Sequence, residues 1–289
     1  MDGRVCRGGA VALESRNAKK PGGRWVNMRR YGRVFREFFR ACLVEELEYR
    51  SEFFGNFIAS FFGVGIALLT VHIFFYQTDR LGGWTYGEVL VLLGVFNTLR
   101  GWIDFALRPN MPRLLEHVRR GTLDYILTKP VDSMFYVSFR HLVFWRLIDV
   151  ALGLGVIGYG LYVERYVPSA ADVLMFFVVM TASLLLIYSL WMMLMTTSFW
   201  VVRIDDLSFI FDSFFDTARF PGSMYRGAVR FVITYVLPAV LITNTPALAL
   251  LGKWSMAAVL AALAVAMLFL WASRRFWRFA LRFYTGAGG

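Results

Sequence analysis

The stretch FFGNFIASFFGVGIALLTVHIFFY, residues 53–76, contains no Lys, Arg, Asp or Glu and decides the class of this protein. An apolar helix of about 20 residues crosses a hydrocarbon layer of roughly 30 Å. The chain of 289 residues is 58% hydrophobic and 18% charged, whereas about 25% of residues are charged in a typical soluble domain. Similar apolar runs follow at about 86–107, 136–162, 172–202 and 254–273. The sequence therefore predicts an all-α integral membrane protein.

The region 203–252 allows two alternatives. Its first part carries four Asp residues, and its second part is apolar but interrupted by Pro238 and Pro246. Either the second part is a plain fifth span, or residues 204–220 form the fifth helix and residues 223–246 form a re-entrant hairpin. The hairpin is physically allowed because irregular backbone at membrane depth is tolerated where protein or water covers it.

Lys and Arg are unevenly distributed along the chain. Residues 1–50 contain twelve, residues 108–133 five and residues 274–289 four, whereas the turns 77–85 and 163–171 contain one each. Basic loops stay in the cytoplasm. The distribution therefore predicts that both termini and the long basic loop are cytoplasmic. This requires an even number of crossings, and six spans fit, in a multi-pass protein of the cell membrane.

Residues 31–50 have the pattern of an amphipathic helix, because apolar side chains recur at three- and four-residue spacing. Such a helix lies in the plane of the membrane interface, and an ordinary surface helix is the alternative. Residues 1–27 lack the apolar core of a signal peptide. We expect a disordered tail there and a flexible C-terminus at 284–289. Cys6 and Cys42 form neither a disulfide framework nor a metal site.

Several classes of function are disfavoured by the sequence. The net charge of +11 does not indicate nucleic-acid binding, because the basic residues gather at span ends and not in a stripe interleaved with aromatic residues. The segment GLGVIG, residues 153–158, matches the dinucleotide fingerprint only formally, since it lies inside an apolar run, where glycine predicts close helix packing. No P-loop or other catalytic motif is found, and His72, His117 and His141 lack partners at metal-ligand spacing. The sequence therefore predicts a protein without its own enzymatic site.

Four charged residues lie within the predicted spans. Arg100 and Asp104 are four positions apart in the second span, and Arg146 and Asp149 are three apart in the third. Intramembrane charges are costly, so they pair with one another or face a polar cavity. Two interpretations stay open: structural ion pairs near the span ends, or the wall of a translocation path.

The basic loop 108–133 contains residues typical of the starts and ends of two short helices. Pro112 suits a first helical turn and Gly121 a C-terminal cap. Thr122 suits the N-cap of a second short helix, LDYIL, which ends before Pro130. The leucines of these helices would pack against the membrane ends, and their charged faces would remain free for a cytoplasmic partner. A merely solvated loop is the alternative.

The order of five segments resembles the ABC-2 type permeases, in particular their branch of poorly characterised ABC transporter permease components. The segments are EYRSEFF, LGGWTYGEVLVLLG, RRGTLDYILTKPVDSMF, FWVVR and ARFPGSMYRGAVRFVITYVLPAVLITNTPALALLG. The resemblance covers about residues 28–283. Its most specific parts are the G-T-L-D-x-x-L-x-K-P segment and the two spaced prolines of the last segment.

The resemblance implies a connecting helix at 28–52, followed by a permease domain of six spans at 53–283. Within this domain it implies a coupling region at 108–133, whose helices lie within 112–130. It also implies a re-entrant pair of helices at 221–246, which contains Pro221, Pro238 and Pro246. It implies two separate ATPase subunits, which would bind the ATP and Mg²⁺, so no cofactor is expected in this chain. It also implies a second permease subunit, either an identical copy or a paralogue, within the membrane lipids. The residues expected to couple to the ATPase are Arg113, Leu115, Glu116, Val118, Arg119, Arg120, Gly121, Leu123, Asp124, Lys129 and Pro130.

The predicted function is therefore the permease subunit of an ATP-binding cassette transporter, with export as the direction that the resemblance implies. Two alternatives from other classes stay open. A membrane-embedded enzyme would need a nucleophile and base, or a metal cluster, at matching depth in two spans. A passive channel or scaffold would explain the spans without any coupling to ATP.

Overall fold

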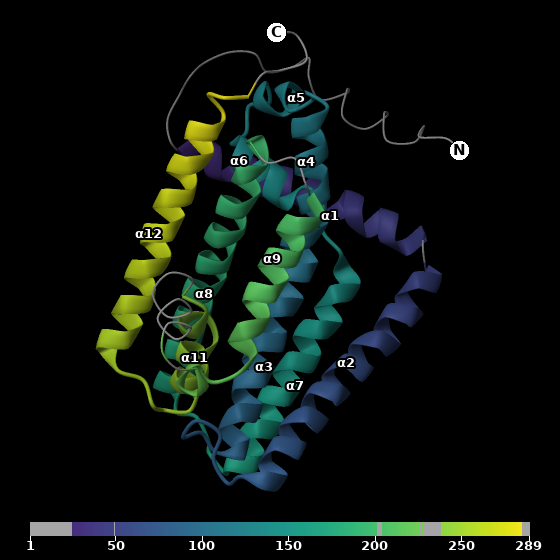
Figure 1. Cartoon of the computed structure of the whole chain (residues 1–289). Coiled ribbons are helices and arrows are strands. Elements are labelled where there is room, and N and C mark those ends of the chain that lie inside the picture. Colours follow the sequence, from purple (N-terminus) through teal and green to yellow (C-terminus); the bar gives the residue numbers. More distant parts are fainter. Residues whose placement is uncertain (1–24, 49, 201–203, 226, 228–237, 285–289) are drawn as a thin grey trace. The chain divides into compact units, whose positions relative to one another are not determined.

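The computed structural model of the chain describes residues 25–48, 50–200, 204–225, 227 and 238–284 (Figure 1). Apart from one isolated bridge between Leu81 and Trp84, the regular elements in these residues are all helices. The prediction of an all-α protein is confirmed. The chain divides into two units at Phe38, and every contact described below lies within the second unit.

Five helical stretches among the described residues are long and apolar enough to cross a membrane. The first stretch is the part of α2 (Arg50–Gln77) from Gly55 onward. The others contain α3 (Tyr86–Trp102), α7 (Leu147–Glu164), α8 (Ala170–Thr196) and α12 (Met256–Ala280). Two further helices, α9 (Ile204–Asp216) and α11 (Ala239–Leu250), have 13 and 12 residues, fewer than the about 20 that a crossing needs. The predicted sixth span therefore stays a prediction.

The bundle has two chemically different ends (Figure 1). The basic end comprises the short helices α4 (Met111–Arg119) and α5 (Asp124–Leu127) and the last turns of α12. The turn end comprises the short connections 78–85, 165–169 and 251–255. At the turn end, Thr85 caps α3 in a capping box with Glu88, and Glu88 also binds the Lys253 ammonium group. Polar contacts therefore close this end between two connections far apart in sequence.

Glycine allows α3 and α7 to pack backbone against backbone. A Cβ atom added at Gly94 would lie 2.6 Å from the backbone nitrogen of Ile157, and one at Gly153 would lie 2.6 Å from that of Thr98. The prediction of close helix packing at GLGVIG is confirmed at Gly153. The other glycines of the segment, Gly155 and Gly158, face open space. Any larger residue at the contact positions would push the two helices apart.

The second span does not end at residue 107 as predicted. After α3 the chain continues through a π-helix, η2 (Ile103–Leu107), and a 3₁₀ turn, η3 (Arg108–Asn110), directly into α4. Tyr86 to Arg119 is one unbroken helical rod. The polar residues after 107 extend this rod because Pro112 stands in the first turn of α4, where its missing N–H costs nothing.

The third span begins later than predicted. A separate helix, α6 (Ser133–Phe139), is capped by the Asp132 carboxylate, which accepts a hydrogen bond from the Phe135 N–H. Residues 140–143 are not helical, and a 3₁₀ turn, η4 (Phe144–Arg146), leads into α7. The Val143 N–H bonds the Phe105 carbonyl of η2, so the break is held by the neighbouring rod. The third span is therefore present over Phe144–Glu164, and its predicted start at about residue 136 is wrong.

The helix α1 (Trp25–Glu48) contains most of the predicted amphipathic segment; its place at a membrane interface stays a prediction. Near its end, the Glu46 carboxylate accepts hydrogen bonds from the backbone N–H groups of Phe144 and Trp145, at 2.7 and 2.9 Å. The start of a helix leaves such N–H groups without partners. Glu46 therefore caps the beginning of η4 and α7 from another helix.

The region 203–252 contains a helix where the second alternative expects the fifth one, α9. After it, Pro221 precedes the 3₁₀ turn η7 (Gly222–Met224), Pro238 is the residue before α11, and Pro246 lies inside α11. Residues 228–237 lie outside the described residues, so the re-entrant hairpin stays a prediction. The Thr243 hydroxyl donates to the Ala218 carbonyl at 2.7 Å, which holds α11 against the end of the α9 segment.

Candidate functional site

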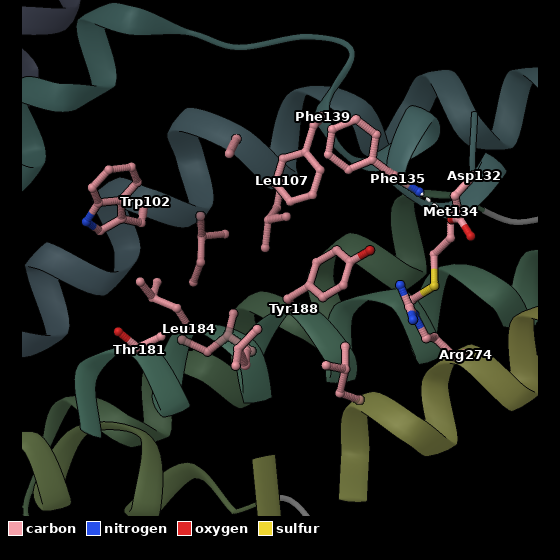
Figure 2. A pocket seen from close by; sticks show the side chains of 15 residues that line it. Trp102, Leu107, Asp132, Met134, Phe135, Phe139, Thr181, Leu184, Tyr188 and Arg274 are labelled. Carbon is pink, nitrogen blue, oxygen red and sulfur yellow. Dashed lines mark hydrogen bonds between the residues drawn. The ribbon is translucent and has the colours of Figure 1, made fainter. Parts of the chain in front are cut away.

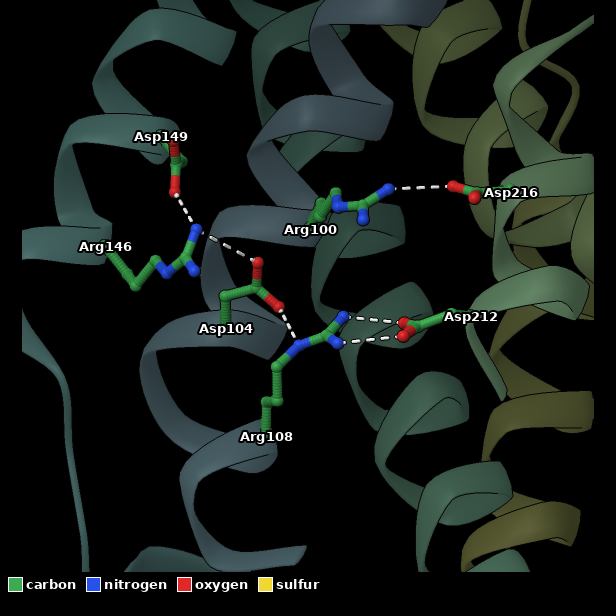
Figure 3. A network of polar contacts seen from close by, with 7 residues as sticks. All are labelled: Arg100, Asp104, Arg108, Arg146, Asp149, Asp212 and Asp216. Carbon is green, nitrogen blue, oxygen red and sulfur yellow. Dashed lines mark hydrogen bonds and ion pairs between the residues drawn. The ribbon is translucent and has the colours of Figure 1, made fainter. Parts of the chain in front are cut away.

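A network of charged side chains joins the α3–α4 rod to α7 and α9 (Figure 3). Its contacts are ion pairs between side chains of three parts of the sequence. Its members are Arg100, Asp104, Arg108, Arg146, Asp149, Asp212 and Asp216. We call these seven residues the charge network.

Arg108 is the centre of the charge network. Its guanidinium donates from Nη1 and Nη2 to the two oxygens of Asp212, at 2.8 and 2.6 Å. Its Nε donates to Asp104 at 2.5 Å, one helical turn earlier. A bidentate arginine–carboxylate pair has fixed geometry and is among the stronger ion pairs. Arg108 therefore fixes α9 against the point where η2 passes into α4.

Arg100 does not pair with Asp104 as predicted. Its Nη1 lies 2.8 Å from Asp216 Oδ1, on α9. Arg100 and Asp104 have the spacing of an intrahelical pair, but the Asp104 carboxylate is taken by Arg108 and by Arg146, at 2.5 and 3.6 Å. Arg100 therefore pairs with Asp216 on α9, and this pair also gives the Asp216 carboxylate a cationic partner.

Arg146 pairs with Asp149 at 3.3 Å, as predicted, and also reaches Asp104. The Arg146 side chain stands at the start of α7, so this contact ties α7 to the rod. The Arg146 guanidinium also lies 3.9 Å from the centre of the Trp145 ring. Asp104, whose side chain is 6% exposed, is therefore buried between two arginines on different elements.

The charge network faces both protein and open surface. Three arginines stand against four aspartates. At roughly 1.5 Å per residue, Arg100 lies about 21 Å and Arg108 about 33 Å along the rod from Tyr86. The side chains of Arg100 and Asp216 are 35% and 49% exposed. Exposed charges at this depth avoid lipid and face water or a second protein chain.

Sequence reasoning missed Arg108, Asp212 and Asp216. The signal was present, since Arg100, Asp104 and Arg108 recur every four positions and Asp212 and Asp216 have the same spacing. Two helices with matching four-residue ladders of opposite charge can pair along one face. The contact between them remained hidden because α9 lies about a hundred residues further along the chain.

The coupling region begins as predicted and differs at its second helix. Gly121 follows α4 in the left-handed region, with φ +66°, and the Thr122 N–H bonds the His117 carbonyl, as in a Schellman cap. The prediction of Thr122 as an N-cap is wrong: α5 has no side-chain cap, and the Thr122 hydroxyl bonds His117 Nδ1 at 2.9 Å. The hydroxyl is used to tie α5 back to α4.

The predicted coupling residues divide into two groups. Leu115 and Leu123 are fully buried and Val118 packs partly buried against the same core. These three side chains hold the helices in place and are not available to a partner. The exposed members are Arg113, Glu116, Arg119, Arg120, Asp124, Lys129 and Pro130, with Gly121 half-buried in the turn. Tyr125, 74% exposed, belongs to the same face and was not predicted.

Side chains from the rest of the bundle brace the coupling region. Asn110 exchanges two hydrogen bonds with the backbone of His141, at 2.8 and 3.0 Å. The Tyr284 hydroxyl accepts from the Leu123 N–H at 3.1 Å, and Trp277 Nε1 donates to the Ser133 hydroxyl at 3.2 Å. The coupling region is therefore fixed to the linker before α7 and to the end of α12.

His141 is held in its neutral form. Its Nε2 lies 3.0 Å from Arg113 Nη1, which can only donate. Burial, together with the guanidinium groups of Arg113 and Arg140, lowers the pKa of His141 to about 3. A neutral imidazole accepts the Arg113 hydrogen bond, whereas a protonated one would repel it. This contact links α4 to the linker 140–143.

The comparisons with known proteins agree with this architecture. A family model described as "ABC-2 family transporter protein" matches residues 61–288. Comparisons with curated proteins and with solved structures give no match. The matched range begins within α2 and includes the charge network and the coupling region.

Proposed function

Because this chain belongs to the ABC-2 family of transporter proteins, we propose that it is an export permease driven through α4 and α5 by a separate ATPase. It is a multi-pass membrane protein and the permease component of an ABC transporter, and the family implies a partner that binds ATP. Export and the coupling route are the proposed parts. They rest on the contacts of the coupling region and of the charge network.

The observation that carries the proposal is the unbroken helical rod from Tyr86 to Arg119. Its far end, α4, belongs to the basic end, and its body carries Arg100, Asp104 and Arg108. Since no loop separates α4 from the charge network, a push on α4 moves Arg108 directly. The π-helix η2 contains Asp104 and lies between Arg100 and Arg108, and π-helical turns occur mostly at functional sites.

In the proposed mechanism, the charge network allows α9 two positions, one held against the rod and one released from it. The pairs Arg108–Asp212 and Arg100–Asp216 hold α9 against the rod. Movement of α4 that separates these pairs would release α9 and expose charged groups to water between them. Return of the rod would close the gap. Of the two interpretations of the intramembrane charges, we adopt the wall of the path.

The exposed face of α4 and α5 suits a protein partner. Arg113, Arg119, Arg120 and Tyr125 are all exposed, and Glu116 pairs with Arg120 at 2.7 Å. Aromatic and arginine side chains are typical anchors of protein interfaces. Two ATPase subunits, one for each of two permease subunits, would bind ATP and Mg²⁺ outside this chain. Whether the second permease is a copy or a paralogue does not alter this contact.

The distribution of Lys and Arg supports a cytoplasmic basic end, with both termini on the same side in the cell membrane. An ATPase that meets α4 and α5 would then lie in the cytoplasm, where its ATP is. Export as the direction rests on the family resemblance alone.

The proposal is tested with the complex of this chain and its partner ATPase, co-expressed and purified in lipid nanodiscs. Tyr125→Ala should reduce both the co-purified ATPase and its nucleotide turnover by about tenfold, the cost of one interface anchor of more than about 1 kcal/mol. The matched control is Tyr162→Ala, since Tyr162 is 80% exposed at the turn end of α7. Equal behaviour of the two variants would refute the coupling face and favour a channel or scaffold without ATP coupling.

A further inference from the structure

A groove lies on the side of the bundle between the rod, α6, α8 and α12 (Figure 2). Its volume is about 410 Å³, within the range of about 300–1,000 Å³ of sites for small molecules. Most of its lining is apolar, including Trp102, Leu107, Phe139 and Leu184. The charge network, on other faces of the rod, contributes none of the lining residues.

The polar side chains of the groove gather at one end. Arg274, Asp132 and Tyr188 lie there, whereas Thr181 and Trp102 lie at the far end (Figure 2). A ligand that fills this groove must therefore have an apolar body and a polar head. A wholly polar solute would meet the apolar lining without hydrogen-bond partners.

The position of the groove along the bundle matches one leaflet. At roughly 1.5 Å per residue, Thr181 lies about 17 Å from the start of α8. Arg274 lies about 27 Å from the start of α12 by the same rise. In a hydrocarbon layer of roughly 30 Å, the far end is near the mid-plane and Arg274 is at the head-group level of the basic end.

The polar end contains one lining cation, Arg274, and one lining carboxylate, Asp132. Arg274 forms no ion pair with any described residue, and Arg278 follows it one helical turn later on α12. The neighbouring Asp132 carboxylate accepts the hydrogen bond that caps α6. Clusters of basic side chains at helix ends attract anionic lipid head groups.

We propose that the groove binds an anionic phospholipid from the leaflet at the basic end, with an acyl chain along Leu184 and Leu107 and the phosphate on Arg274. The lipid would touch Ile103 and Ala106, the π-helical part of the rod. It would fill the space beside that part and support its present geometry. This inference does not depend on the direction of transport or on ATP coupling.

The test uses the full chain in nanodiscs that contain a phosphatidylglycerol with a photoreactive group at the acyl end. Cross-linked peptides are identified by mass spectrometry. Adducts should appear on the α8 peptide around Leu184. Arg274→Gln should reduce their yield by about fivefold, the loss expected for one basic contact to an anionic lipid. The control is Arg275→Gln, since the Arg275 guanidinium lies over the Trp271 ring and does not line the groove.

A second variant, Leu184→Trp, fills the apolar part and keeps Arg274. It should also lower the yield, and it tests the acyl site even where Arg274→Gln does not fold. Unchanged labelling in both variants overturns the proposal. Equal labelling by a phosphatidylcholine probe overturns the anionic head group. Chain-to-chain cross-links at the groove, in place of lipid adducts, show a second copy as its occupant and also overturn the proposal.

Discussion

Arg108 and Asp212 are 104 positions apart in the sequence, yet the Arg108 guanidinium donates two hydrogen bonds, of 2.8 and 2.6 Å, to the Asp212 carboxylate. This pair joins the helical rod that ends in α4 to α9. It is the closest connection between the coupling region and a helix that the proposed mechanism moves.

Asp212→Asn should lower the free energy of unfolding by about 1–3 kcal/mol, the range for hydrogen bonds to charged groups. The lower part of that range is expected, because Arg108 is 37% exposed and solvent screens the pair. Thermal unfolding in detergent measures it. The matched control is Glu116→Gln, which breaks the exposed Glu116–Arg120 pair and should cost less than about 0.5 kcal/mol. Equal losses in the two variants would contradict the central place of Arg108–Asp212.

Gly153→Val should separate α3 from α7. Even a Cβ atom at Gly153 would lie 2.5 Å from the Thr98 hydroxyl and 2.6 Å from the Thr98 backbone nitrogen. Overpacking costs about 1–3 kcal/mol, and backbone contact leaves little room to relax. The yield of monodisperse protein and its melting temperature report the effect. Gly155→Val, on the same helix but facing open space, should behave like the unmodified chain, and a similar loss there would disprove the packing argument.

Glu46→Ala should loosen the beginning of α7. The Glu46 carboxylate accepts from two backbone N–H groups, and the loss of a helix cap costs about 0.5–2 kcal/mol. Hydrogen exchange of the peptide that contains Phe144 and Trp145 should become faster. Glu37→Ala serves as control because Glu37 is exposed. Unchanged exchange in Glu46→Ala would mean that the cap contributes nothing to the order of this turn.

Acidification should weaken the contact between α4 and the linker before α7. The folded pKa of His141 is about 3, below the value of about 6.5 for a free histidine. The unfolded chain therefore binds more protons between these values. The stabilisation is complete above about pH 6.5 and is lost as the pH falls toward the folded pKa. The melting temperature should fall more between pH 7.5 and 5 in the original chain than in His141→Gln; parallel curves would rule out this role.

The sequence was sufficient to predict the membrane-length helices because an apolar run of that length has few structural alternatives to a membrane-spanning helix. The run 53–76 lies inside α2, and the glycine of GLGVIG that packs closely, Gly153, was found from its surroundings. The break at 140–143 was missed because apolar residues stand on both sides of it. Contacts from other elements hold the break, among them the bond of the Val143 N–H to the Phe105 carbonyl and the bonds of Asn110 to the His141 backbone.

Only part of the charge network could be predicted, because its other contacts also depend on a second element. Spacing identifies pairs within one helix, such as Arg146 and Asp149, and that pair is present. It does not say that Asp216 on α9 competes with Asp104 for Arg100. The expected packing of the leucines is present, since Leu115 and Leu123 are fully buried, and their role in coupling to the ATPase stays a prediction.

The central claim is that movement of α4 reaches α9 through an unbroken rod. It is tested by the distance between spin labels at Phe209 on α9 and Leu154 on α7, both exposed, in the complex with its ATPase, with and without ATP. Because α7 packs on α3, this distance reports the separation of α9 from the rod. It should change by about 2–5 Å, as in helix shifts of other switching proteins. Two glycines inserted after Asn110 should abolish the change while ATPase binding is retained. An identical change with the insertion, or none in the original complex, would contradict the claim.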